Sequence, residues 1–189
     1  MDTQSEPKGS AIVIVGGPSL KLRNPVKKIL ESGFKGTIIA ADGSMGYCLR
    51  NGLTPHYVVT VDGHPHRIVR WYGDPDLETR PTDDYFARQD LDPAFRTNQA
   101  RVNRELIALV NASGPKMKAI LSTSSPVSVT ARAKQAGMEL YWWNPIYDDY
   151  DAPDSITKKL FDSNGIPCMV TGGNVGTCAW ILAHAILRH

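Results

Sequence analysis

Three apolar runs rich in β-branched residues, each followed by glycine, serine or aspartate, constrain the fold of this chain most strongly. The runs are Ala11–Val15, Thr37–Ala41 and Tyr57–Val61. A short continuous run of this kind is typical of a strand buried on both faces of a parallel sheet. Helical patterns separate the runs, and strands that alternate with helices predict an α/β fold with a doubly wound, mostly parallel, Rossmann-like sheet.

The rest of the chain continues this alternation after one irregular stretch. We interpret residues 1–10 as a disordered tail and residues 11–189 as a single domain, with an irregular, proline-rich insertion at 64–98. The last helix runs to the end of the chain, where alternation predicts another strand, so a fragment lacking a C-terminal strand remains an alternative. The expected helices are Leu20–Ser32, Ser44–Asn51, Pro65–Trp71, Val102–Asn111, Val127–Ala136, Asp154–Ser163 and Asn174–Leu187, and the further strands are Lys118–Ser122, Met138–Trp142 and Pro167–Thr171.

Composition argues against several classes of protein. The formal net charge is only +2, which gives no reason to expect a nucleic-acid partner. Cys48, Cys168 and Cys178 have neither disulfide-framework nor zinc-knuckle spacing, and sparse cysteine fits a reducing cytoplasm. No apolar run approaches the roughly 20 residues that span a bilayer. We therefore expect a cytoplasmic protein with no membrane span; its oligomeric state stays open.

Two glycine-rich turns, each between a strand and a helix, are candidates for binding phosphate. The first is Gly16-Gly17-Pro18-Ser19 and the second is Gly172-Gly173-Asn174, with Thr177 one turn further on. Glycine lets a ligand approach the backbone, and the amides at a helix start favour anions. Neither turn has the spacing of a dinucleotide fingerprint or a P-loop. An ordinary strand-to-helix turn, or close packing of the last helix at Gly176, is the structural alternative.

The other strand ends carry acids and hydroxyls. Asp42-Gly43-Ser44 follows the second run and is able to bind a ribose or to cap a helix. Asp62 follows the third run, where one carboxylate suits Mg²⁺ held against a diphosphate, and His64 lies beside it. The structural alternatives are a turn residue for Asp62 and a surface loop for His64. Ser122 ends a later strand. Because the carboxyl ends of parallel strands share one edge, we predict a nucleotide site there, with Asp62 and His64 as catalytic candidates and Asp62 as the metal ligand.

An aromatic loop adds a further candidate for ring binding. Residues 141–150 hold two tryptophans, three tyrosines and two adjacent aspartates. The aromatic side chains are able to stack on a base or a pterin ring. Packing in the core is the alternative, and we expect it for one of Trp142 and Trp143.

The ordered motifs resemble the MptE-like, 6-hydroxymethylpterin diphosphokinase-like family. They are Val15–Leu20, Ala41–Ser44 with Gly52 and Pro55, Val59–Gly63 and Gly172–Gly176. The resemblance implies transfer of a diphosphate from ATP to a pterin-like alcohol with Mg²⁺, with Gly16–Ser19 facing phosphates and Asp62 facing metal or diphosphate. The Asp42-Gly43 motif is also similar to that of thiamine diphosphokinases, which carry more acids at the third strand end than Asp62 alone.

Two other functions remain open at this stage. The start of the chain also resembles Maf-type flagellin glycosyltransferases and related sialyltransferases. That resemblance implies a CMP-activated sugar without an essential metal, with Gly16–Ser19 and Asn174 on the nucleotide and His64 or a loop tyrosine as acid or base. The last alternative is a non-catalytic module that binds a nucleotide. For the diphosphokinase-like transferase and for the glycosyltransferase, the partners are a nucleotide and a small-molecule acceptor.

Overall fold

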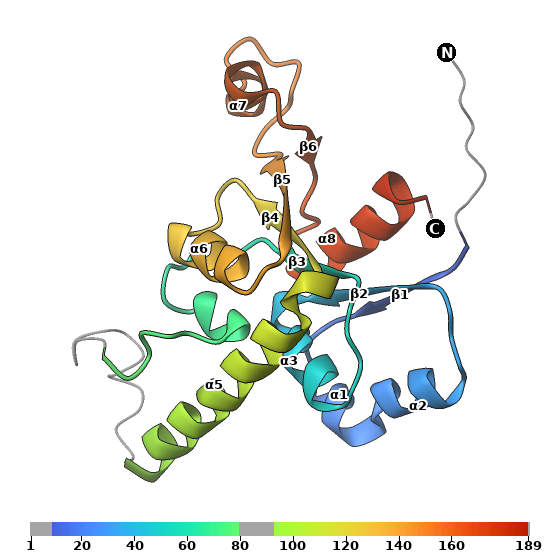
Figure 1. Cartoon of the computed structure of the whole chain (residues 1–189). Helices are drawn as coiled ribbons and strands as arrows, with labels where there is room; N and C mark the ends of the chain where they lie inside the picture. The colour runs from blue at the N-terminus through green and yellow to red at the C-terminus, as the bar shows by residue number, and fades with distance from the viewer. Residues whose placement is uncertain (1–8, 80–92, 189) are drawn as a thin grey trace.

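The protein is an α/β domain built on a parallel sheet, as the alternating sequence pattern predicts. The computed structural model describes residues 9–79 and 93–188. Six parallel strands lie side by side in chain order, from β1 at one end of the sheet to β6 at the other (Figure 1). They are β1 Ala11–Ile14, β2 Thr37–Ala41, β3 Tyr57–Thr60, β4 Lys118–Ser122, β5 Glu139–Pro145 and β6 Cys168–Met169.

Helices connect the strands and cover both faces of the sheet (Figure 1). Short 3₁₀ turns occur at η1 (Val69–Tyr72) and η2 (Gly114–Lys116), and the last helix continues into a π-helical turn, η3 (Leu182–Ile186). Among the described residues, no helix is long and apolar enough to cross a membrane. The helices are α1 Pro18–Arg23, α2 Pro25–Glu31, α3 Asp42–Arg50, α5 Pro93–Ser113, α6 Val127–Gln135, α7 Ile156–Asn164 and α8 Val175–Ile181.

Alternate side chains of the strands pack into separate cores on the two faces of the sheet. Ile38 and Ala40 of β2 pack with α2 and α3, whereas Ile39 points to the opposite face. There it meets Cys178 and Ala179 of α8, which are fully buried. Burial of strand residues on both sides explains why the runs in the sequence are apolar throughout. Because the strands follow chain order, α8 reaches its face only after the chain returns from β6, at one end of the sheet, to β1 at the other.

The helix expected over Leu20–Ser32 is two helices that meet at Asn24. Asn24 has a left-handed backbone, with φ of 40°, and its side-chain oxygen accepts a hydrogen bond from the Lys27 amide at 3.3 Å. Pro25 follows, and proline has no N–H with which to continue α1. Asn24 therefore ends one helix and caps the next.

Other boundaries differ from the expectation by a few residues or more. The helix expected from Val102 begins at Pro93, inside the stretch read as irregular. The strand expected over Met138–Trp142 is Glu139–Pro145, and the extended piece at 167–171 contains only a two-residue strand. Residues 80–92 of the expected insertion and 1–8 of the expected tail lie outside the described residues.

Candidate functional site

The turns at the carboxyl ends of β1, β2 and β3 form one continuous rim. At β1, Val15 packs so closely on α8 that a Cβ on Gly176 would lie 2.7 Å from its Cγ1 atom. At β2, the Ser44 hydroxyl is 2.6 Å from the Ile14 carbonyl oxygen, to which it donates. The structure thus brings together the two glycine-rich turns and the Asp42–Ser44 motif, which are far apart in the sequence.

Both glycine-rich turns are open to solvent. Gly16 through Ser19 are exposed, and a Cβ added at Gly16 would meet no atom within 4 Å. A Cβ on Gly173 would likewise meet nothing within 4 Å. Gly172 and Gly173 have φ values of 61° and 84°, a conformation that favours glycine. Among residues 9–79 and 93–188, no side chain fills the space at Gly16 or Gly173, so an anionic group has access to the backbone there.

Asn174 and Thr177 organise the start of α8. The Asn174 side-chain oxygen accepts a hydrogen bond from the Thr177 amide at 2.9 Å, which makes Asn174 the N-cap of the helix. Thr177 is half-buried against Gly172, where a Cβ would lie 2.2 Å from its Cγ2 atom. The Asn174 side chain is exposed, and its amide nitrogen is a donor at the same turn.

Asp42 is the most perturbed acid of the rim. Its carboxylate is 5% exposed and accepts a hydrogen bond from the Gly43 amide at 2.6 Å. Burial above all, together with the negative charge of Asp62, raises the pKa of Asp42 to about 6, while hydrogen bonds from Gly43 and Thr60 and the positive charge of Arg67 oppose the rise. A nearby cation would relieve this cost. By contrast, Ser44 is fully buried, and its hydroxyl serves the protein backbone.

Asp62 and His64 belong to one tight turn after β3. The exposed Asp62 carboxylate accepts a hydrogen bond from the His64 amide at 2.9 Å. The His64 Nδ1 atom in turn accepts from the Arg67 amide at 3.1 Å. A neutral imidazole that accepts through Nδ1 carries its proton on Nε2, so this geometry makes His64 a hydrogen-bond donor at Nε2.

The hydroxyl-rich turn after β4 packs against the Asp62 turn. Ser122 is fully buried, with its hydroxyl 2.6 Å from that of Ser124. A Cβ on Gly63 would lie 3.1 Å from the Ser124 carbonyl oxygen, and the Ser124 hydroxyl donates to the Val61 carbonyl oxygen at 3.4 Å. Ser122 therefore supports the rim from below, and Ser124 is the hydroxyl that reaches its surface.

Asp148, in the aromatic loop, accepts hydrogen bonds from the start of α7. Asp148 accepts hydrogen bonds from the Ser155 and Thr157 hydroxyls at 2.8 and 2.7 Å and from the Ile156 amide at 2.6 Å. These hydrogen bonds, those of Thr157 above all, lower the pKa of Asp148.

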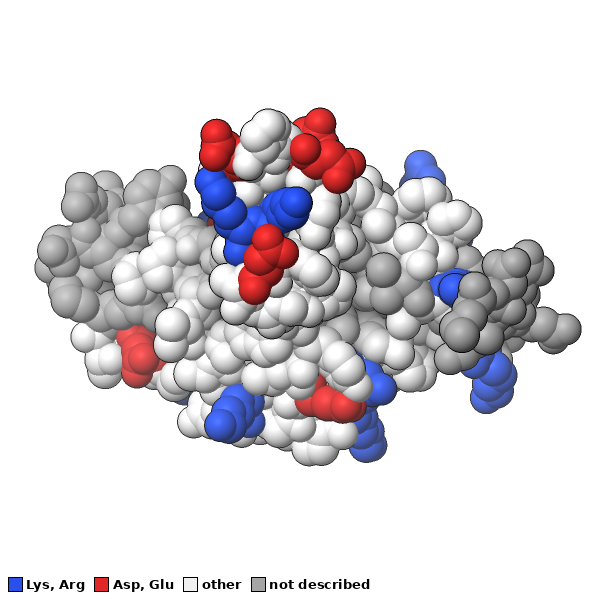
Figure 2. Space-filling view, turned by 90° about the horizontal axis from the view of Figure 1, so that it is seen from above, with Lys and Arg blue, Asp and Glu red and all other residues white. Residues whose placement is uncertain are grey.

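Trp143 is the tryptophan that belongs to the core, as expected for one of the pair, and Trp142 is 36% exposed. In Figure 2 acidic and basic side chains stand together over the top of the molecule, where Figure 1 places α7.

Sequence reasoning missed three residues that contact the Asp42 motif or lie beneath it. Thr60, at the end of β3, forms a buried hydrogen bond of 2.7 Å with the Tyr72 hydroxyl. Trp71, next in the chain to Tyr72, lies beside Gly43, where a Cβ would be 3.8 Å from the indole Cε2 atom. Both contacts join residues that are well separated in the sequence, and no local pattern signals them.

The donor set at the rim suits magnesium better than a transition metal. Within residues 9–79 and 93–188, no group of three or more histidine, cysteine, aspartate or glutamate side chains comes together. Asp42 and Asp62 are close enough for the charge of one to raise the pKa of the other. Mg²⁺ commonly takes one or two carboxylates and fills its other positions with water and phosphate oxygens. Asp62, with Asp42 behind it, fits that requirement.

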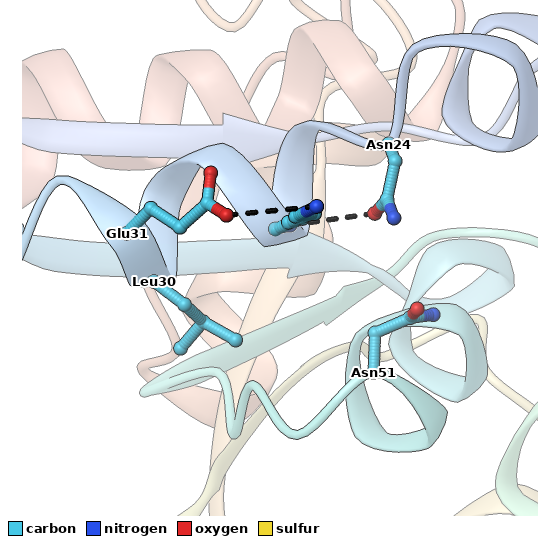
Figure 3. A pocket seen from close by; sticks show the side chains of 5 residues that line it. Asn24, Leu30, Glu31 and Asn51 are labelled. Carbon is cyan, nitrogen blue, oxygen red and sulfur yellow. Dashed lines mark hydrogen bonds and ion pairs between the residues drawn. The ribbon is translucent and has the colours of Figure 1, made fainter.

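A separate hollow of about 280 Å³ lies between α2 and the end of α3 (Figure 3). Its polar side chains already interact with each other. Lys27 is 3.6 Å from Glu31, and the Asn24 oxygen accepts from the Lys27 amide and from the Tyr47 hydroxyl. The hollow is not part of the rim. It is lined by Asn24, Lys27, Leu30, Glu31 and Asn51.

Comparison with known proteins finds a family match in the first part of the chain. Residues 2–72 match the family model of the 6-hydroxymethylpterin diphosphokinase MptE-like proteins. This confirms the resemblance for the motifs at Val15–Leu20, Ala41–Ser44 and Val59–Gly63, while Gly172–Gly176 lies beyond the matched residues. No match was found among curated proteins or among solved structures.

Proposed function

We propose that this chain, whose residues 2–72 match the MptE-like family model, is a transferase that moves a diphosphate from ATP to a small, pterin-like alcohol. The observation that carries the proposal is the meeting of the open turns at Gly16 and Gly173 with the carboxylates Asp42 and Asp62 on one rim. Open backbone suits phosphate groups, and paired acids suit the metal that accompanies them. One rim thus has both parts of a nucleoside triphosphate site, open backbone for the phosphates and carboxylates for the metal.

The reaction needs positioning more than covalent help from the protein. The acceptor oxygen forms a bond to the β-phosphorus of ATP, and the bond from that phosphorus to the oxygen bridging the α-phosphate breaks. AMP leaves, and the alcohol proton passes to water. The attacking and leaving oxygens lie roughly in line in such transfers. The glycine turns would hold the phosphates, and the Nε2–H of His64 would donate to a phosphate oxygen whose charge grows.

Mg²⁺ would be held by Asp62, with Asp42 adding negative charge from beneath. The ion supplies neutralisation of the phosphate charge when it is bound. Asp62 is exposed, and among the described residues no cationic side chain lies within hydrogen-bonding or ion-pair distance of its carboxylate. The carboxylate therefore faces solvent at the rim. Asp42 is buried and burial raises its pKa, so a further positive charge beside it would stabilise the charged carboxylate.

The test is formation of AMP from ATP in the presence of 6-hydroxymethylpterin and Mg²⁺. We expect AMP and pterin diphosphate in equal amounts and none after EDTA. Asp62→Asn should lower kcat at least 100-fold, whereas the matched control Asp162→Asn, on exposed α7, should leave it unchanged. ATP turnover that persists in Asp62→Asn would refute the assignment. CMP in place of ATP, with and without EDTA, tests the glycosyltransferase alternative, which predicts metal-independent binding of CMP.

A second variant separates binding from folding. Gly16→Ala adds a methyl group in open space at a position where φ is not in the left-handed region, so its melting temperature should stay near that of the wild type. The same methyl group would occupy the space in which a phosphate approaches the backbone. We expect ATP affinity to fall about tenfold or more, which isothermal titration with a non-hydrolysable analogue measures. Unchanged affinity would show that the Gly16 turn is not a phosphate site.

A further inference from the structure

The indole of Trp71 lies flat against the start of α3. The two indole atoms nearest a Cβ built on Gly43 are Cε2 at 3.8 Å and Cδ2 at 4.0 Å. These two atoms form the bond that the two indole rings share, so the approach from Gly43 is through the face of the ring and not across its edge. Trp71 is nevertheless 40% exposed. The exposed part is therefore the ring face turned away from Gly43, called the outer face here, together with the edge of the ring.

The neighbours of Trp71 hold the backbone of this segment in place. Tyr72 is fully buried beneath the rim and bonded to Thr60, and the Gly73 carbonyl oxygen accepts a hydrogen bond of 2.7 Å from the buried Arg132. The Trp71 amide itself donates to the Ile68 carbonyl oxygen at 2.9 Å. An exposed tryptophan on so firmly anchored a segment loses little conformational freedom when a ligand binds.

Trp71 and the glycine turn of α8 reach the rim from opposite faces of the sheet. Val69 and Tyr72 of η1 belong to the core under α3 and α5, whereas Val175 and Cys178 of α8 belong to the core of the other face. The acids lie between them: Asp42 precedes Gly43, and Asp62 follows β3. An in-line transfer places the acceptor and the leaving AMP on opposite sides of the reacting phosphorus. With phosphates at the glycine turns, the acceptor belongs on the Trp71 side.

We propose that the outer face of the Trp71 indole is the platform on which the flat heteroaromatic ring of the acceptor stacks. This inference rests on the proposed function for the orientation of the two substrates. Tryptophan offers the largest ring face among the side chains, and stacking on it discriminates flat acceptors from aliphatic alcohols.

The experiment compares Trp71→Leu, Trp71→Phe and the control Trp180→Leu in the full chain. Trp180 is also exposed, at 57%, but its indole stacks on His184 with ring centroids 5.3 Å apart. The probe is 6-hydroxymethylpterin, titrated against tryptophan emission and by calorimetry. Loss of ring stacking should weaken pterin binding about tenfold in Trp71→Leu and less in Trp71→Phe, with no change in Trp180→Leu. Affinity for a non-hydrolysable ATP analogue should stay within twofold of the wild type.

Quenching gives a signature that a merely structural role would not produce. Pterin should quench wild-type and Trp180→Leu emission, and Trp71→Phe should remove that quenching while circular dichroism shows a folded chain. If Trp71→Leu does not fold, Trp71→Phe decides. The platform would be overturned if the Trp71 variants bind pterin with unchanged affinity, or if they lose affinity for the ATP analogue and not for pterin. Normal AMP formation with an unchanged KM for pterin in Trp71→Leu would overturn the platform alone. Pterin quenching at Trp71 without any AMP formation would overturn the proposed function alone.

Discussion

Gly176, in the first turn of α8, and Val15, just after β1, are in such close contact that a Cβ on the glycine would lie 2.7 Å from one Val15 methyl carbon and 3.1 Å from the other. This contact joins the end of the chain to its beginning. It sets the start of α8, and with it the Gly172-Gly173 turn, beside the turn at Gly16. The geometry of the rim therefore depends on the absence of a side chain at one position.

The first prediction tests this contact with a double-mutant cycle. Gly176→Ala should lower the free energy of unfolding by about 1 to 2 kcal/mol, since overpacking exceeds the gain in helix propensity. In a Val15→Ala background both Val15 methyl groups are absent, while the Asn174 side-chain oxygen remains 3.1 Å from the added Cβ, so the same substitution should cost less. Urea unfolding of the four proteins gives the coupling energy. A cost of Gly176→Ala that is equal in both backgrounds would show that Val15 is not its cause.

The second prediction concerns the buried acid Asp42. Burial raises its pKa to about 6 in the folded protein, so the folded state binds a proton more tightly than the unfolded state. The sign follows: the charged form costs stability above pH 6, and the cost disappears as the pH falls toward the unfolded pKa of about 4. Asp42→Asn keeps the acceptor for the Gly43 amide and removes the charge.

We expect Asp42→Asn to be more stable than the wild type at pH 8 by up to about 2 to 3 kcal/mol and equal to it at pH 4. Chemical denaturation at the two values measures the difference, with Asp162→Asn as the exposed control. The same substitution should lower transferase activity, which is the usual relationship between a strained site and stability. A stability difference that is independent of pH would contradict the assigned cause.

The local signals of the sequence were sufficient for the parallel sheet and for the clusters at its carboxyl edge. β-Branched runs such as Ala11–Val15 and breakers such as Gly16-Gly17 carry information within a few residues, and the structure has strands and turns there. The gathering of these turns at one edge also follows from the parallel direction of the strands. The roles of the single side chains did not follow. Ser44 and Ser122 were expected at the ligand and are fully buried.

Long-range packing decides what the sequence left open. The strand order, the passage of α8 to the second face and the contact of Trp71 with Gly43 depend on residues far apart in the chain. Asp148 shows the same limit. The sequence showed only that it lies in an aromatic, acidic loop, whereas its four hydrogen bonds to residues 155–157 make it part of the start of α7.

The third prediction follows from that cap. Asp148→Ala removes the acceptor of the Ile156 and Thr157 amides, so both should exchange with solvent deuterium faster than in the wild type. The pKa of Asp148 is lowered by these hydrogen bonds, so their contribution is present above the pKa of the unfolded chain and is lost as the pH falls from there through the lower pKa of the folded protein. Protection of α7 should therefore weaken in acid in the wild type only. Asp162→Ala, within the same helix, is the control that should leave both amides protected.

The last prediction concerns Arg132, which connects α6 to the segment that carries Trp71. Its side chain is 3% exposed, its Nε donates to the Gly73 carbonyl oxygen at 2.7 Å, and its Nη2 donates to the Asn111 side-chain oxygen at 2.9 Å. Arg132→Met leaves both oxygens without this donor and should lower the free energy of unfolding by about 2 to 4 kcal/mol. The exposed control Lys134→Met should leave the free energy of unfolding unchanged. Because Gly73 is two residues from Trp71, the folded variant should also bind pterin more weakly while its affinity for the ATP analogue is kept. Weakening of both ligands together would mean that Arg132 supports the whole rim and not the Trp71 segment.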